Sequence, residues 1–90
     1  MDETRLKRLR FRAWRRGFRE ADLILGPFAD SHAQSFSEDE AAAFEALLDQ
    51  QDHDVYEWVT GAPAPPAFET GLLARIRAFQ AGGGARIKQD

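Results

Sequence analysis

Apolar residues recur every three or four positions through most of this chain, and no segment alternates apolar and polar residues as a half-buried β-strand does. In residues 18–30, for example, Phe18, Ala21, Leu25 and Phe28 trace one stripe along a helix. Ninety residues are enough for one modest hydrophobic core and too few for two. The pattern therefore predicts an all-α fold, a compact single-domain bundle of five helices.

Five segments carry this helical spacing, and signals at their ends indicate where each helix begins and stops. The predicted helices cover residues 4–15, 18–30, 37–51, 54–60 and 66–80. Gly26 and Pro27 interrupt the second segment. Because a proline removes one backbone hydrogen bond, we expect a kink or an early end near Leu25. Pro66 suits the first turn of the last helix.

The ends of the third and fourth helices carry the clearest signals. Ser37 and Glu40 have the spacing of a capping box, in which each side chain binds the other residue's amide. Asp54 and Glu57 repeat this spacing at the start of the fourth helix. Gly61 is placed to end that helix.

Residues 1–81 are expected to form the five-helix domain, and residues 82–90 a flexible Gly-rich tail. The sequence has no cysteine, which excludes disulfides, a thiolate zinc site and a catalytic thiol. Its two histidines, His32 and His53, lack the clustered spacing of a metal site. Apolar runs fall far short of the ~20 residues that cross a bilayer. The N-terminus has no apolar segment of the kind found in signal peptides.

Charge is segregated along the chain more strongly than the formal net charge of −3 suggests. Residues 1–20 carry a net charge of +5, residues 21–74 hold eleven acidic side chains and no lysine or arginine, and residues 75–90 carry +3. One interpretation is that the basic ends fold against the acidic middle and neutralise it. The other is that the folded surface is dipolar and orients a charged partner. The pattern alone favours the first.

No group of side chains has the composition of a catalytic or metal site, so neither is predicted. Most carboxylates lie in the expected first turns of helices or on an acidic face. A phosphate-binding Gly-rich loop is lacking. The basic run from Arg5 to Arg19 could follow nucleic-acid phosphates, but a sequence pI of about 5.3 and the acidic middle oppose this. We expect binding to neither nucleic acid nor membrane.

The segment from Arg16 to Glu20 is the strongest candidate for a binding surface. Arg16 and Glu20 are four residues apart, a spacing that would place both side chains on one face of a helix. Gly17 between them has no side chain, so a partner could approach the backbone there. Arginine and aromatic residues are enriched at binding hot spots, which favours a protein–protein patch. The alternative is an ordinary surface ion pair between Arg16 and Glu20.

Two short motifs resemble those of a known family. Residues 16–20, Arg-Gly-Phe-Arg-Glu, match the R-G-x-x-E motif of the succinate dehydrogenase assembly factor (flavinator) family, the SdhE-like proteins. Residues 52–58, Asp-His-Asp-Val-Tyr-Glu-Trp, resemble the second signature of that family. The resemblance extends in order over residues 5–80. This chain departs from the family at Phe18 and Ala21, where Met and Leu are common.

The resemblance implies a five-helix bundle that assists covalent attachment of FAD to the flavoprotein subunit of succinate dehydrogenase and, in some bacteria, of fumarate reductase. Such factors act as chaperones, and the flavin bond forms on a histidine of the client. We therefore expect that this chain is not an enzyme and binds no cofactor stably, because FAD belongs to the client. By the resemblance, its client-binding residues are Arg16, Gly17, Glu20 and Asp22.

Further expectations concern the second signature, the oligomeric state and the location of the protein. Tyr56 and Trp58 of the second signature are expected to be mainly structural. The protein is expected to be a monomer in the bacterial cytoplasm, or in the mitochondrial matrix if it is a processed eukaryotic form. The alternatives are an antitoxin-like or DNA-binding small helical regulator, because this family has also been proposed to include antitoxins, and a plain structural adaptor.

Overall fold

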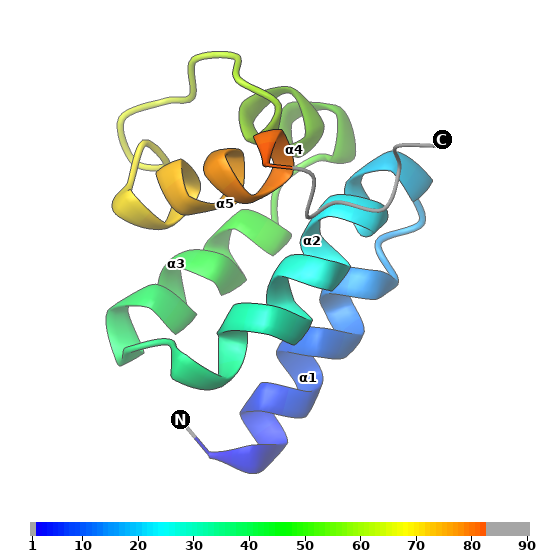
Figure 1. Cartoon of the computed structure of the whole chain (residues 1–90), viewed down its shortest axis with the longest axis vertical. Coiled ribbons are helices and arrows are strands. Elements are labelled where there is room, and N and C mark those ends of the chain that lie inside the picture. Colours follow the sequence, from blue (N-terminus) through cyan, green and yellow to red (C-terminus); the bar gives the residue numbers. More distant parts are fainter. Residues whose placement is uncertain (1, 83–90) are drawn as a thin grey trace.

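The computed structural model describes residues 2–82, which form five α-helices, a short 3-10 turn and no strand (Figure 1). The elements are α1 (Glu3–Trp14), α2 (Arg19–His32), η1 (Ala33–Ser35), α3 (Glu38–Leu48), α4 (Asp52–Val59) and α5 (Gly71–Ala81). The prediction of an all-α fold with five helices is confirmed over this part of the chain. None of these five helices has the length and apolar content needed to cross a bilayer. The predicted flexible tail, apart from Gly82, falls outside the described residues.

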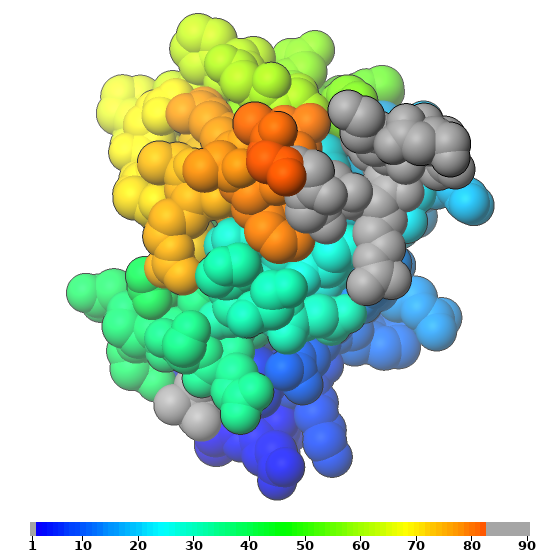
Figure 2. Space-filling view, in the orientation of Figure 1, coloured from blue at the N-terminus to red at the C-terminus, as the bar shows by residue number. Residues whose placement is uncertain are grey.

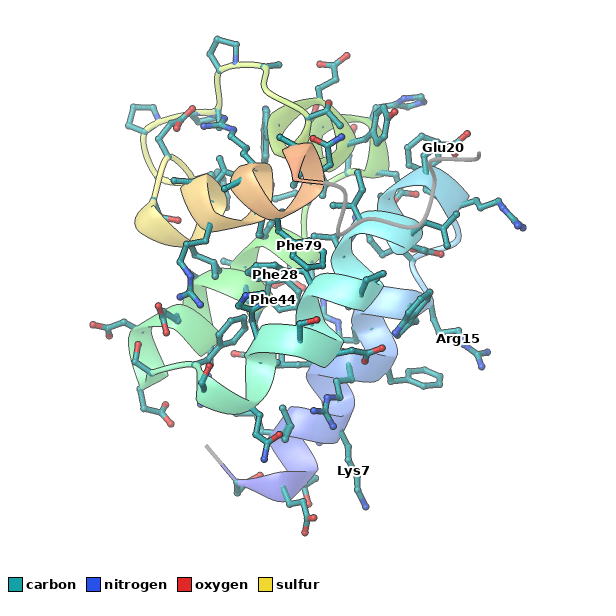
Figure 3. The ribbon with its side chains drawn as sticks, viewed as in Figure 1. Lys7, Arg15, Glu20, Phe28, Phe44 and Phe79 are labelled. Atoms are coloured by element: carbon teal, nitrogen blue, oxygen red, sulfur yellow. The ribbon has the colours of Figure 1, made fainter. Side chains whose placement is uncertain are left out.

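Helix α2 occupies the centre of the bundle. It runs antiparallel to α1 and also lies against α4 and α5 (Figure 1). In the space-filling view, α2 (cyan) separates α1 (blue) from α5 (orange) (Figure 2). The fully buried Phe28 of α2 has its ring centroid 6.2 Å from that of Phe44 in α3 and 5.4 Å from that of Phe79 in α5 (Figure 3). Aromatic contacts at these separations stabilise the core beyond simple burial, so this cluster joins three helices.

Of the kink or early end expected near Leu25, the early end is wrong, because α2 continues through Gly26 and Pro27 to His32. Gly26 and Pro27 are both buried, and the packing of this helix face outweighs the hydrogen bond that the proline removes. Gly26 has a further role, because a Cβ atom there would overlap the indole ring of Trp14 in α1. The glycine lets α1 and α2 approach closely, at some cost in helix propensity.

Two local signals at helix ends are confirmed. The Glu40 amide donates to the Ser37 hydroxyl at 3.1 Å, and the Ser37 amide donates to the Glu40 carboxylate at 2.9 Å, which completes the capping box of α3. Gly61 follows α4 with a φ of +124°, and the Ala62 amide donates back to the Glu57 carbonyl at 2.8 Å. This is the arrangement of a Schellman motif, which favours glycine at its left-handed position.

The junction between α3 and α4 differs from the prediction. Helix α3 ends at Leu48 instead of near Gln51, and α4 begins at Asp52 instead of Asp54. Asp54 therefore lies within the first turn of α4 and does not form the predicted capping pair with Glu57. The cause is not local, because a side chain from the loop between α1 and α2 binds this junction.

Helix α5 also starts later than predicted, at Gly71 instead of near Pro66. The residues before it form a turn in which the Phe68 amide donates to the Pro65 carbonyl at 2.8 Å. The Thr70 hydroxyl then accepts an amide hydrogen bond of 3.2 Å from the first turn of the helix. A threonine N-cap thus sets the start, although a proline also suits a first helical turn.

Ion pairs join the basic ends of the chain to its acidic middle, which supports the first interpretation of the charge pattern. The pairs are Arg5 with Glu38 and Glu45, Arg12 with Asp49, Arg16 with Asp52, Arg75 with Glu40, and Arg77 with Glu69. The Arg5 guanidinium holds the pKa of Glu45 below its usual value, and Arg77 does the same for the pKa of Glu69. Apart from the Arg16–Asp52 pair, whose guanidinium is buried, these pairs are partly exposed and each contributes little to stability on its own.

The pKa values of Glu45, Glu69 and Glu40 are all lowered in the folded protein, which predicts a loss of stability in acid. The pKa of Glu40 is lowered mainly by the hydrogen bond from the Ser37 amide and further by Arg75. A carboxyl group with a lower pKa in the folded state stabilises the fold above its ordinary pKa, 4.5 here. This contribution disappears as the pH falls through the folded-state pKa. Thermal melts should therefore show a nearly constant unfolding temperature above about pH 5 and a decline below it.

A pair of variants tests the cause of this decline. Glu69→Gln removes the carboxylate that Arg77 and the Ala64 amide bind, so its unfolding temperature should fall less steeply in acid. Glu57→Gln is the control, because Glu57 is exposed and its carboxylate binds no other described residue. An acid decline as steep in Glu69→Gln as in Glu57→Gln would contradict the assignment.

Candidate functional site

The chain turns from α1 into α2 through residues 15–18, which we call the motif loop. Gly17 has a φ of +90°, a left-handed conformation that residues with a side chain adopt only with strain. Helix α2 begins after Phe18, so Arg16 lies outside any helix. The prediction that Arg16 and Glu20 share one helical face is therefore wrong, and the two side chains have different surroundings.

The Arg16 side chain is directed into the protein, where it is only 6% exposed. Its Nη1 donates to the Leu48 carbonyl and its Nη2 to the Gln50 carbonyl, each at 2.6 Å. Its Nε donates to Asp52 Oδ1 at 3.1 Å, and Nη2 lies 2.9 Å from the same oxygen. Carbonyls at a helix C-terminus lack partners within the helix, and a positive charge there is favourable. Arg16 thus closes the junction between α3 and α4.

Asp22 holds the motif loop from the side of α2. Its Oδ1 accepts a hydrogen bond of 3.1 Å from the backbone N–H of Arg16. Its own amide donates to the Phe18 carbonyl at 3.0 Å, which starts the helix. The half-buried Asp22 and the buried Arg16 side chain therefore fix the conformation of the loop.

Gly17 and Glu20 are exposed on the outer side of the motif loop. A Cβ atom on Gly17 would have nothing within 4 Å, so its backbone conformation, and not crowding within this chain, requires the glycine. Glu20 makes no hydrogen bond or ion pair with the residues that the structure describes (Figure 3). The four predicted site residues thus divide into two that hold the loop, Arg16 and Asp22, and two that are accessible to a partner.

Residues of α4 pack against the motif loop, so the two sequence motifs meet in space. The Phe18 ring centroid lies 5.3 Å from that of His53 and 5.7 Å from that of Tyr56, the latter in an edge-on contact. Asp52 pairs with Arg16 across 36 positions of sequence. Sequence reasoning missed the pairing of Asp52 with Arg16 and the contact of the exposed His53 with Phe18. The only signal that could have linked them was the joint presence of the two motifs.

The rest of the second motif supports the fold. Trp58 is buried and its ring stacks on Phe68 with centroids 5.2 Å apart, in agreement with a structural role. Among residues 2–82, no three histidine, aspartate or glutamate side chains gather closely enough to hold a metal ion. A rigid loop that presents a glycine and an unbound carboxylate is suited to recognising another protein, because little has to be ordered on binding.

Comparisons with known proteins agree in pointing to one family. A family model described as "Flavinator of succinate dehydrogenase" matches residues 7–80. "Succinate dehydrogenase assembly factor 2, mitochondrial" of Drosophila grimshawi is 37% identical over 76 residues, which cover 81% of this chain and 52% of the relative. "Succinate dehydrogenase assembly factor 2-A, mitochondrial" of Drosophila yakuba is 34% identical over an alignment of 92 positions, which covers 97% of this chain and 57% of the relative. The chain spans about half the length of these curated relatives.

Proposed function

Because the chain belongs to the family of flavinators of succinate dehydrogenase, we propose that it is an assembly factor for that enzyme. It would promote covalent attachment of FAD to the flavoprotein subunit and, where the organism has fumarate reductase, to the corresponding subunit there. The relatives are named as assembly factors and not as enzymes, which agrees with the expectation that this chain catalyses no reaction itself. We place it where its client matures, in the bacterial cytoplasm or the mitochondrial matrix.

The observation that carries this proposal is that different residues of the motif loop region hold the loop in place and face the solvent. Arg16 and Asp22 hold the loop from behind, while Gly17 and Glu20 are exposed at its surface. A partner backbone can approach Gly17 without meeting a side chain, and Glu20 can accept hydrogen bonds from the partner. Since the loop is already fixed, docking would lose little conformational entropy.

The mechanism we propose is a shift in the conformation of the client. A factor that bound every state of the flavoprotein equally would change nothing, so it must prefer the state in which FAD and the client's histidine are aligned. In this scheme FAD stays with the client, and this chain contributes a docking surface and no reacting group. The preference for one state lowers the barrier only while the factor is bound.

Two substitutions in the exposed pair test the proposal. Gly17→Arg would fill the space left for the partner, and Glu20→Ala would remove the acceptor. If each residue is a binding hot spot, the affinity for the client should fall about tenfold or more. Covalent flavin on the co-expressed flavoprotein subunit, measured by in-gel flavin fluorescence, should decrease accordingly.

Matched variants separate docking from folding. Gly17→Ala imposes the same positive φ on a residue with a side chain but adds little bulk, so it measures the effect of strain alone. Asp39→Ala removes an exposed carboxylate at the start of α3, and is the control for Glu20→Ala. Unchanged client flavin in folded Gly17→Arg and Glu20→Ala proteins would refute the role of the motif loop.

A further inference from the structure

One face of α1 carries a groove with an unusual combination of side chains. Its lining residues follow each other at helical spacing; they are Lys7, Arg10, Phe11, Trp14 and Arg15. The groove has a volume of about 480 Å³, and we call it the outer α1 groove. Lys7 and Arg15 project from α1 on the side away from the rings of Phe28 and Phe44 (Figure 3).

The positive charges of this groove are not neutralised by the fold. Arg5 and Arg12, on the other side of α1, bind carboxylates of α3 and of the residue that follows it. Lys7, Arg10 and Arg15 have no carboxylate partner among the described residues. The Nε of Arg10 is moreover buried without any hydrogen-bond acceptor in residues 2–82. Buried donors are rarely left unbound, because losing water without replacement is costly, so this group indicates a missing acceptor.

The groove also contains an exposed apolar side chain, that of Phe11. Phe11 is 62% exposed and is the one large apolar side chain so exposed among the described residues. The Arg15 guanidinium lies over its ring, with Cζ 5.1 Å from the ring centroid. Trp14 packs over Gly26 of α2, and its Nε1 donates to Asp30 at 3.2 Å. The Trp14 ring in the groove is therefore held in place by its contacts with α2.

We propose that the outer α1 groove binds an acidic segment of the client protein, a few residues long, that also carries an apolar side chain. Carboxylates of that segment would pair with Lys7, Arg10 and Arg15, the cations that the fold leaves without a carboxylate partner among the described residues. An apolar side chain would cover Phe11. This inference rests on the proposed function for the identity of the partner, and on charge complementarity and aromatic exposure for its chemistry.

The position of the groove fits such an extension of the docking surface. Arg15 belongs both to the groove and to the motif loop, so the two surfaces are continuous. From Lys7 to Arg15 the helix rises only about 12 Å, which is short for a nucleic-acid strand and long enough for a few peptide residues. The exposed aromatic ring also favours a partner with apolar side chains.

Binding of the purified flavoprotein subunit to the full chain tests this proposal. Phe11→Ala and Lys7→Ala alter exposed side chains that do not pack in the hydrophobic core, so both variants should fold as the wild type does. We expect the dissociation constant for the client to rise about tenfold in Phe11→Ala and about threefold in Lys7→Ala. Arg8→Ala is the matched control, because Arg8 is an exposed cation of the same helix outside the groove, and it should change affinity by less than about twofold.

The outcomes separate this proposal from the proposed function. Equal weakening in Lys7→Ala and Arg8→Ala, or unchanged affinity in Phe11→Ala, would overturn the groove as a docking site. If Gly17→Arg and Glu20→Ala still lowered client flavin, the assembly function would stand without it. A fluorescein-labelled single-stranded oligonucleotide that bound at physiological salt, lost binding in Lys7→Ala and competed with the client would also overturn it, in favour of a nucleic-acid site.

Discussion

Replacing Arg16 with alanine should lower the free energy of unfolding by about 3 kcal/mol, one of the two largest effects that we expect from a single change in this protein. The substitution removes a buried guanidinium and leaves the carbonyls of Leu48 and Gln50 without its hydrogen bonds. For a domain of this size the unfolding temperature should fall by roughly 12–24 °C. Circular dichroism at increasing temperature or denaturant measures this directly.

Two further variants show whether geometry or charge is responsible. Arg16→Lys keeps the charge but cannot reach two carbonyls and a carboxylate at once, so it should lose about 2 kcal/mol. Asp52→Asn keeps both carbonyl contacts and should lose only about 1 kcal/mol. Wild-type stability in Arg16→Ala would show that the guanidinium does not hold the junction. Any loss of client flavin in Arg16 variants has to be corrected for the fraction of folded protein, because Arg16 stabilises the fold as well as the motif loop.

Replacing Gly26 with alanine is expected to destabilise the protein by about 2 kcal/mol, although alanine is the better helix former. The added Cβ would overlap the Trp14 indole, and the crossing of α1 over α2 would have to open. Gly71→Ala is the matched control, because Gly71 also lies in a helix and a Cβ there would meet nothing within 4 Å. Denaturant unfolding of both variants should show a loss of stability only in Gly26→Ala.

A double-mutant cycle isolates the contact between these two residues. Trp14→Leu removes most of the bulk above Gly26, so Gly26→Ala should cost little in that background. The coupling energy between the two sites should be about 1–2 kcal/mol. Purely additive effects would mean that Gly26 is required for another reason, such as the strain imposed by the following Pro27.

Two helix ends set by neighbouring residues were predicted from the sequence, the local Thr70 cap of α5 was missed, and the ends set by distant residues were not predictable. The Ser37 capping box and the Gly61 terminator depend on atoms a few residues apart, and both are present as predicted. The start of α4 depends on Arg16, which lies far away in the chain. The passage of α2 through Pro27 likewise depends on burial against other helices. Local rules cannot supply such contacts, because they arise only once the helices pack.

The candidate site shows the same division. The sequence singled out Arg16, Gly17, Glu20 and Asp22 as one group, and the structure places all four at or beside the motif loop. The sequence did not show that Arg16 is directed inward, because the spacing of Arg16 and Glu20 was treated as helical although the predicted helices, 4–15 and 18–30, leave Arg16 and Gly17 between them. The surplus of arginine in residues 1–20 was visible, but its division into bound and unbound cations requires the packed structure.

The hydrogen bonds between Arg16 and the α3–α4 junction affect which substitutions this sequence can accept during evolution. A mutation at Asp52 alters the support of a loop whose own residues are untouched, so under the proposed docking role of this loop selection also acts on the distant aspartate. Replacements at the two positions should be accepted together more readily than singly. Sequences that keep the first motif but have lost the acid of the second would then have to hold the loop by a different contact, and their binding surface should have changed with it.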